Sequence, residues 1–207
     1  MVFKDRIAAA QALIPFLVPY ALKPVVVLAI PRGGVPMGKE IATHFGWPLS
    51  VMLTKKIGHP MNKEYAIGAV GLDAVLLDKG HPEVPEFYVK EETERMRLLL
   101  EDRYKKFLGT HRMESVKGKS VVIVDDGIAT GYTIKMSVEI LKKQQPDKII
   151  IAVPVATPKA LKAIRKLVDD VIVLHTPLDF IGVGQYYNDF SEVTDEDVQV
   201  ILQKYDH

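Results

Sequence analysis

Two neighbouring carboxylates, Asp125 and Asp126, stand directly after an apolar run and directly before a turn rich in glycine and hydroxyl groups. The run is Val121–Val124, and the turn leads into a segment with helical periodicity at Thr133. A helix amino terminus offers unpaired N–H groups and a positive dipole end to a phosphate. Two acids beside such an anion site would repel the phosphate unless they face a diol or a hydrated magnesium ion. The pattern therefore indicates a sugar phosphate site, with simple capping of the helix by the acids as the alternative.

The turn between the acids and the helix contains the groups that would hold the phosphate. Thr130 and Thr133 add hydroxyl donors, and Gly131 allows the backbone to approach the ligand closely or to adopt a positive φ. Ligands of open α/β sheets bind where strands end, which is where this turn lies.

A second glycine-rich segment follows the apolar run Val25–Ile30. Its glycines and Lys39 have the spacing of a nucleotide-binding P-loop. That motif needs Ser or Thr after its lysine to reach magnesium, whereas here Glu40 would face the phosphates. Pro36 also removes one backbone amide from the cradle. We therefore rank a P-loop kinase below the alternatives, and a plain glycine turn between a strand and a helix stays open for this segment.

The segment Lys55–Gly71 mixes lysine, histidine, proline, asparagine and glycine with little periodicity. We interpret it as a long exposed loop. Such loops are uncommon in compact domains unless they act as lids or binding segments. A solvated run of lysines is the alternative interpretation.

Elements that could position these residues are evident from the hydrophobic pattern. Apolar runs rich in β-branched residues predict strands at Val25–Ile30, Val121–Val124 and Ile149–Val155, and weaker runs of the same kind predict strands at Leu49–Leu53 and Val171–Leu174. Helical segments are predicted at Phe3–Leu17, Gly38–Phe45, Glu91–Leu108, Tyr132–Lys143, Pro158–Leu167 and Asp195–Tyr205. The alternation of helices and strands predicts an α/β domain with a parallel sheet.

Composition limits the class of protein. A chain of 207 residues with a net charge of +1 fits one domain and provides no global field for nucleic acid or membrane. No cysteine is present, and the six histidines show no close ligand pairing, so a transition metal is not expected. The uncharged stretch Ile7–Leu22 imitates a signal peptide, but two prolines interrupt it. We therefore expect a soluble cytoplasmic protein with no nucleic acid or membrane partner.

The segment from Val121 to Thr133 resembles the signature of type I phosphoribosyltransferases for 5-phosphoribosyl 1-pyrophosphate (PRPP). The resemblance implies that Asp125 and Asp126 contact the ribose hydroxyls. It also implies that the residues after them hold the 5-phosphate, namely Gly127, Ile128, Ala129, Thr130, Gly131, Tyr132 and Thr133. The chain departs from the family at Gly127, where many members carry a branched apolar residue, and at Tyr132, where glycine is frequent. Neither departure removes a phosphate ligand.

The resemblance extends from Val25 to Phe190 and implies the fold of that family. This is a three-layer α/β fold in which a mainly parallel sheet is flanked by helices, with a flexible lid at about 55–71 and a small hood at about 177–207. The whole chain, 1–207, would be a single phosphoribosyltransferase domain.

Further site residues follow from the same resemblance. Arg32, Gly33 and Gly34 match the loop that binds the pyrophosphate, in which the family often has a cis non-proline peptide; Arg32-Gly33 is our candidate bond. The lid would bring Lys56, or failing that Lys55, to the departing pyrophosphate.

The segment Pro177–Phe190 resembles the acceptor side of an uncharacterised bacterial and archaeal branch of the family. Phe180 or Tyr187 would stack on a planar base. Core or dimer contacts are the alternative role for such aromatic residues.

Taken together, the residues and the resemblance predict magnesium-dependent transfer of a phosphoribosyl group from PRPP to a nitrogen nucleophile, with a nucleobase as the first candidate. The Mg²⁺ would be bound mainly through PRPP, with no direct protein ligand or with Asp125 and Asp126 as its ligands. The partners would be PRPP, a small acceptor molecule and a second copy of the chain in a homodimer. The alternative is a regulator of the same fold that binds PRPP or a nucleotide without catalysis. The acceptor itself is not identified by the sequence.

Overall fold

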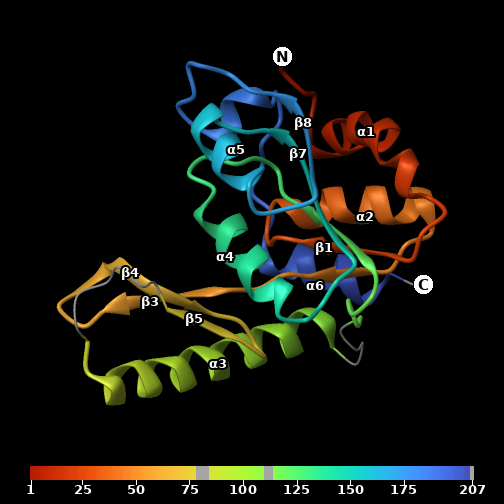
Figure 1. Cartoon of the computed structure of the whole chain (residues 1–207). Helices are drawn as coiled ribbons and strands as arrows, with labels where there is room; N and C mark the ends of the chain where they lie inside the picture. The colour runs from red at the N-terminus through yellow and green to blue at the C-terminus, as the bar shows by residue number, and fades with distance from the viewer. Residues whose placement is uncertain (78–83, 110–113, 206–207) are drawn as a thin grey trace.

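The computed structural model describes residues 1–77, 84–109 and 114–205, which form a large sheet with its helices and a projecting arm (Figure 1). The helices are α1 (Arg6–Leu17), α2 (Gly34–Phe45), α3 (Glu86–Leu108), α4 (Tyr132–Lys142), α5 (Pro158–Ile164) and α6 (Asp195–Gln203), with 3-10 turns η1 (Val18–Tyr20) and η2 (Val183–Tyr186). The strands are β1 (Val25–Ala29), β2 (Leu49–Val51), β3 (Lys55–His59), β4 (Asn62–Val70), β5 (Val75–Leu77), β6 (Ser120–Val124), β7 (Lys148–Val155) and β8 (Asp170–His175). Within these three ranges, no helix is both long and apolar enough to cross a bilayer.

The main sheet has five strands in the order β2-β1-β6-β7-β8, and every neighbouring pair is parallel. This confirms the predicted α/β fold, because all five predicted apolar runs form its strands. All residues of β1 and β6 are buried, as expected for a parallel sheet that has helices on both faces.

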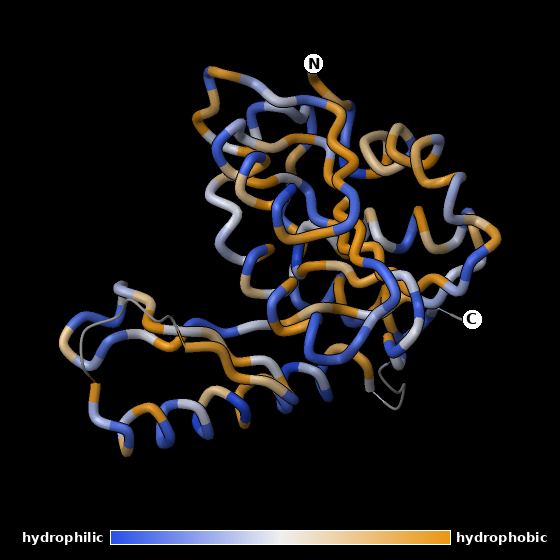
Figure 2. Tube along the Cα trace, in the orientation of Figure 1, coloured by the Kyte–Doolittle hydropathy of each residue, from blue (hydrophilic) through white to orange (hydrophobic). Residues whose placement is uncertain are grey.

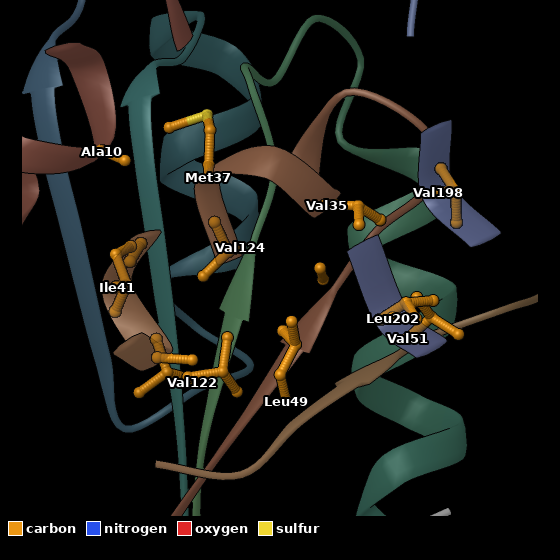
Figure 3. Close-up of a cluster of buried hydrophobic side chains, with 14 of the residues drawn as sticks. Ala10, Val35, Met37, Ile41, Leu49, Val51, Val122, Val124, Val198 and Leu202 are labelled. Atoms are coloured by element: carbon orange, nitrogen blue, oxygen red, sulfur yellow. The ribbon is translucent and has the colours of Figure 1, made fainter. Parts of the chain in front are cut away.

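Alternate residues of the central strands belong to two separate hydrophobic cores. In β6, Val122 and Val124 pack with residues of α1, α2 and α6, whereas Val121 and Ile123 pack with residues of α4 and α5. Figure 3 shows the first of these cores, with side chains of α2 and α6 gathered against those of β2 and β6. Figure 2 shows the corresponding concentration of hydrophobic residues along the central strands. The sheet is therefore held rigidly from both sides, which fixes the loops at its edge.

The segment Lys55–Gly71 is not a loop, and that prediction is wrong. It forms β3 and β4, which pair in antiparallel fashion, and β5 completes a separate three-stranded sheet. Figure 1 shows this sheet projecting with α3 alongside it as an arm. Ile57 and Ile67 are fully buried in a core that also contains residues of α3. Register shifts around Gly58 break the alternation of polar and apolar residues, which hides these strands from the sequence pattern.

Two helices begin earlier than predicted. α2 begins at Gly34 rather than Gly38, because Pro36 is its third residue, where a backbone N–H has no partner within the helix. α3 begins at Glu86 rather than Glu91 and carries an acidic residue in its first turn, which suits the helix dipole.

Candidate active site

The two predicted phosphate loops begin side by side at one edge of the main sheet. Strands β1 and β6 are parallel neighbours, with Ala29 opposite Val124 at their carboxyl ends. The Ile30 N–H donates to the Val124 carbonyl over 2.9 Å. The chain therefore leaves both strands at the same place, with the acid pair on one loop and Arg32 on the other.

The loop after β6 forms a cavity of about 200 Å³ at the amino end of α4. Its lining contains every residue predicted to hold the 5-phosphate, together with Asp125, Ile134 and Val183. Gly131 caps α4 with a φ of +75°, and a Cβ there would lie 3.2 Å from atoms of Ala160 and Ile164. The loop thus requires glycine at this position both for its backbone conformation and for its close packing.

The acids are partly buried, and their surroundings oppose ionisation. The Asp126 N–H donates to Asp125 Oδ1 over 2.9 Å. Burial raises the pKa of Asp125 well above its usual range, and the neighbouring Asp126 charge raises it further. Burial also raises the pKa of Asp126, although the Arg6 guanidinium opposes that rise. A ligand that supplies donors or a cation would therefore be favoured at this pair.

Arg6 is a site residue that the sequence did not predict. Its Nε and Nη2 donate to Asp126 Oδ2 over 3.0 and 2.9 Å, and its Nη1 donates to the Ser191 carbonyl over 2.7 Å. Its guanidinium also lies 4.0 Å from the ring centre of Phe190. Both charged side chains of the pair are mostly shielded, with 12% of Arg6 and 15% of Asp126 exposed. Arg6 therefore fixes the carboxylate of Asp126 from the side of α1.

The loop after β1 approaches Asp126 so closely that only glycine fits. A Cβ on Gly33 would lie 1.8 Å from Asp126 Oδ2, and one on Gly34 would lie 2.5 Å from the Val124 carbonyl oxygen. A cis non-proline peptide is present in this loop, but it is Pro31-Arg32 rather than the predicted Arg32-Gly33. Gly33 is the residue that caps α2 and already has helical φ and ψ. The cis bond therefore lies one residue before the predicted position.

A second cavity, of about 390 Å³, lies beside Asp126 and is lined by Arg6, Arg32, Gly33, Asp126, Phe190, Glu192 and Val193. Arg32 Nη2 contacts Glu192 Oε1 across it at 2.8 Å. Phe190 belongs to the aromatic segment Pro177–Phe190 that stands out in the sequence. Glu192 lies beyond that segment, and nothing in the sequence marked it as a site residue.

The structure also bears on the P-loop alternative. Gly34–Phe45 is helical, so Lys39 lies on α2 and is not part of a phosphate-binding loop. Gly38 faces the sheet instead, where a Cβ would lie 2.9 Å from the Ala29 Cβ.

The predicted lid lysines do not lie with the acid pair. Lys55 and Lys56 are on β3 and line a different cavity, of about 470 Å³, together with residues of α3. Within that cavity the buried Glu92 is paired with Arg95 at 2.7 Å and with Lys63 at 3.6 Å. Neither Lys55 nor Lys56 lines the two cavities beside Asp125 and Asp126.

The two aromatic residues predicted to stack on an acceptor are packed against the protein. Tyr187 is 6% exposed, and its hydroxyl donates to the Asp126 carbonyl over 2.7 Å. Burial raises the pKa of its phenol, so it remains a donor. Phe180 stacks on Tyr186 with ring centres 5.7 Å apart. In this structure Tyr187 therefore supports the backbone of the acid pair and does not offer its ring to a base.

Comparison with known proteins gives consistent results. A family model described as "Phosphoribosyl transferase domain" matches residues 4–190. "Putative phosphoribosyl transferase Rv0571c" of Mycobacterium tuberculosis is 34% identical over 206 residues, which are 98% of this chain and 46% of that protein. The same identity and coverage apply to "Putative phosphoribosyl transferase MT0597" from another strain of that organism. The chain thus spans about half the length of these curated relatives. The crystal structure of TT1426 from Thermus thermophilus covers 99% of both chains, at 38% identity and a TM-score of 0.89.

Proposed function

We propose, because this chain belongs to the phosphoribosyl transferase family, that it transfers the 5-phosphoribosyl group of PRPP to a nitrogen nucleophile and releases pyrophosphate. The observation that supports this most is the pair of cavities that meet at the acid pair. Asp125 lines the smaller one at the amino end of α4, and Asp126 lines the larger one beside Arg32. PRPP has a phosphate at one end of a diol-bearing sugar and a pyrophosphate at the other, which matches this arrangement.

In the proposed complex, the 5-phosphate occupies the smaller cavity. The backbone amides and hydroxyls from Gly127 to Thr133 would donate to it, aided by the dipole of α4. The carboxylates of Asp125 and Asp126 accept hydrogen bonds from the ribose hydroxyls. Arg32 and the amides beside it hold the pyrophosphate at the other end of the sugar.

The chemistry then requires positioning and charge stabilisation, and no protein nucleophile. The electron pair of the C1–O bond leaves with pyrophosphate, and the lone pair of the acceptor nitrogen forms the new bond to C1. A proton carried by that nitrogen then passes to pyrophosphate or water. Arg32 stabilises the charge that develops on the leaving group, while the acid pair holds the ribose in line with the acceptor. Arg6 and Tyr187 contribute indirectly, because they fix the side chain and the backbone of Asp126.

Magnesium is part of the proposal. Among the described residues there is no group of three or more His, Asp or Glu side chains that could hold a metal. The two acids alone fit an ion that takes most of its ligands from phosphate oxygens and water. When bound, Mg²⁺ would neutralise charge on the pyrophosphate.

The lysines of the arm have a proposed role as well. Closure of the arm over bound PRPP would have to carry Lys56, or Lys55, from the cavity beside α3 towards the pyrophosphate. Replacing Lys56 by alanine would then lower the rate of pyrophosphate release while leaving the affinity for PRPP nearly unchanged.

The central test combines PRPP binding with turnover. Titration calorimetry with PRPP and Mg²⁺ should show binding to the wild-type protein, and pyrophosphate should be released when a suitable acceptor is present. Asp125→Asn should lose most of this turnover without unfolding, because an amide cannot carry the negative charge that holds the ribose and Mg²⁺. Unaltered turnover in this variant would remove the assignment.

The position of the lysines keeps one alternative open. A protein that binds PRPP without bringing a lysine to the pyrophosphate would act as a PRPP or nucleotide sensor. Such a protein would bind PRPP in the calorimeter and release no pyrophosphate with any acceptor. A cytoplasmic homodimer completes the proposal, and sedimentation and cell fractionation test it.

A further inference from the structure

The larger cavity has two walls that come from distant parts of the chain. One wall is Arg32 and Gly33 after β1, and the other is Phe190, Glu192 and Val193 after η2. The ion pair between Arg32 and Glu192 is the contact that joins the walls. The Glu192 side chain is 71% exposed, so its carboxylate is held only lightly in this position.

The direction in which PRPP lies determines what this cavity receives, and this step rests on the proposed function. If the 5-phosphate occupies the cavity lined by Asp125, the C1 end of the ribose points to the cavity lined by Asp126. The departing pyrophosphate and the incoming nitrogen are both attached at C1. In-line displacement puts them on opposite faces of C1, so the cavity that receives C1 borders both of them, and Glu192 lines that cavity.

The charges in the cavity indicate how Glu192 would be used. The cavity has two cations and two carboxylates: Arg6, Arg32, Asp126 and Glu192. Arg6 is already engaged with Asp126, the Ser191 carbonyl and the ring of Phe190. Arg32 is therefore the cation of this cavity that can bind the pyrophosphate, and its planar guanidinium suits phosphate oxygens well.

Once Arg32 turns to pyrophosphate, Glu192 loses its counter-ion and faces another anion. A carboxylate only accepts hydrogen bonds, so N–H donors on the acceptor would satisfy it. A carboxylate on the acceptor would add a third negative group to the same cavity and be repelled. We infer that Glu192 is a specificity-determining residue, whose carboxylate selects planar acceptors with amino or amidine N–H donors over acceptors that carry a carboxylate.

The test compares Glu192→Gln with the wild-type protein on two kinds of acceptor. Adenine and guanine represent heterocycles with amino donors, and orotate and nicotinate represent those with a carboxylate. The wild-type protein should release pyrophosphate from PRPP faster with at least one amino-bearing acceptor than with either acid. Glu192→Gln should lower kcat/KM for that acceptor by about tenfold to a hundredfold, the usual size of a lost hydrogen bond to a charged group.

The affinity for PRPP should not decrease in the same variant. Glutamine no longer competes with pyrophosphate for Arg32, so the Kd of PRPP in calorimetry should stay the same or fall by up to about fivefold, the range for an exposed ion pair. If Glu192 had a purely structural role, its replacement would weaken the binding of PRPP and of the acceptor together. The matched control is Glu196→Gln, which removes an exposed carboxylate paired with Lys106 at 3.6 Å on α6, outside the cavity. It should leave both measurements unchanged.

Several outcomes would overturn the inference. The inference would be wrong if Glu192→Gln kept the wild-type kcat/KM for the amino-bearing acceptor. It would also be wrong if the wild-type protein turned over only orotate or nicotinate, or showed no turnover with any amino-bearing acceptor. A higher Mg²⁺ requirement with equal losses on all acceptors would mean that the carboxylate serves the metal instead. If wild-type protein fails to bind PRPP, the proposed function falls and the orientation used here falls with it. If PRPP binds and only the acceptor results disagree, the role of Glu192 alone is wrong.

Discussion

Replacing Gly33 by alanine would test whether the two loops of the site must touch. The backbone of Gly33 has φ of −61° and ψ of −30°, which alanine adopts freely, so any effect comes from the added methyl group. That methyl would lie 1.8 Å from Asp126 Oδ2 and 2.5 Å from its Cγ. Because packed atoms cannot overlap to this extent, we expect the carboxylate to move by about 1 Å or more.

The movement would cost both stability and ligand affinity. Asp126 would lose the two contacts with Arg6, at 3.0 and 2.9 Å, in a shielded position. Hydrogen bonds to charged groups contribute about 1.5–3 kcal/mol, which for a chain of this length lowers Tm by about 3–12 °C. Since the same carboxylate is proposed to hold the ribose, the Kd of PRPP should rise by about tenfold or more.

Differential scanning calorimetry and titration with PRPP and Mg²⁺ would measure the two effects. Gly182→Ala is the matched control, since Gly182 has an extended backbone and a Cβ there would meet no atom within 4 Å. It should behave as wild type. If Gly33→Ala keeps the wild-type Tm and PRPP affinity, the close approach of the loops does not matter for the site.

Three further changes give distinct results. Burial and the Asp126 charge raise the pKa of Asp125 above its ordinary value of 3.8, so its ionisation destabilises the fold as pH rises. Asp125→Asn should therefore gain stability over wild type as pH rises above about 4 in urea unfolding, even though turnover is lost. Hydrogen bonding from Arg95 lowers the pKa of Glu92, so its stabilisation is present above the unfolded pKa and is lost as pH falls through the folded value. Glu92→Gln should lower Tm at pH 7, and its difference from wild type should disappear in acid. Tyr187→Phe removes the 2.7 Å hydrogen bond to the Asp126 carbonyl and should lower Tm by about 2–4 °C, with acceptor preference unchanged in turnover assays.

The main sheet and the loop between β6 and α4 could be predicted because their signals are local. Each strand lies in a short apolar run, most of these runs contain several β-branched residues, and the loop from Asp125 to Thr133 is continuous in the sequence. A continuous loop keeps its residues together whatever the rest of the fold does. Glycine at position 131 indicated either a close approach of the backbone to a ligand or a positive φ, and the positive φ is present.

The arm could not be predicted in the same way, because its strands depend on tertiary contacts. Ile57 and Ile67 are buried against residues of α3, and the irregular pairing around Gly58 hides the alternating pattern. Strands of this kind follow their packing more than their intrinsic preference.

The partners of Asp126 could not be predicted for another reason. Arg6 lies 120 positions away from it in the sequence, and Tyr187 lies 61 positions away. A single sequence contains no sign that an arginine in the first helix pairs with an acid after a central strand. The aromatic segment near Tyr187 stands out in the sequence, but composition cannot separate support of the backbone from contact with a ligand.

The bond from Arg6 to the Ser191 carbonyl joins residues 185 positions apart. A ribosome adds about 5–20 residues per second, so Arg6 waits about 10–40 s after its own synthesis before this partner exists. Until then the nascent chain can complete its early strands, but the wall of the cavity that includes Phe190 is missing. The cavity beside Asp126 is consequently completed only after Ser191 has been synthesised, and a nascent chain that stops before this residue would lack one wall of the proposed binding site.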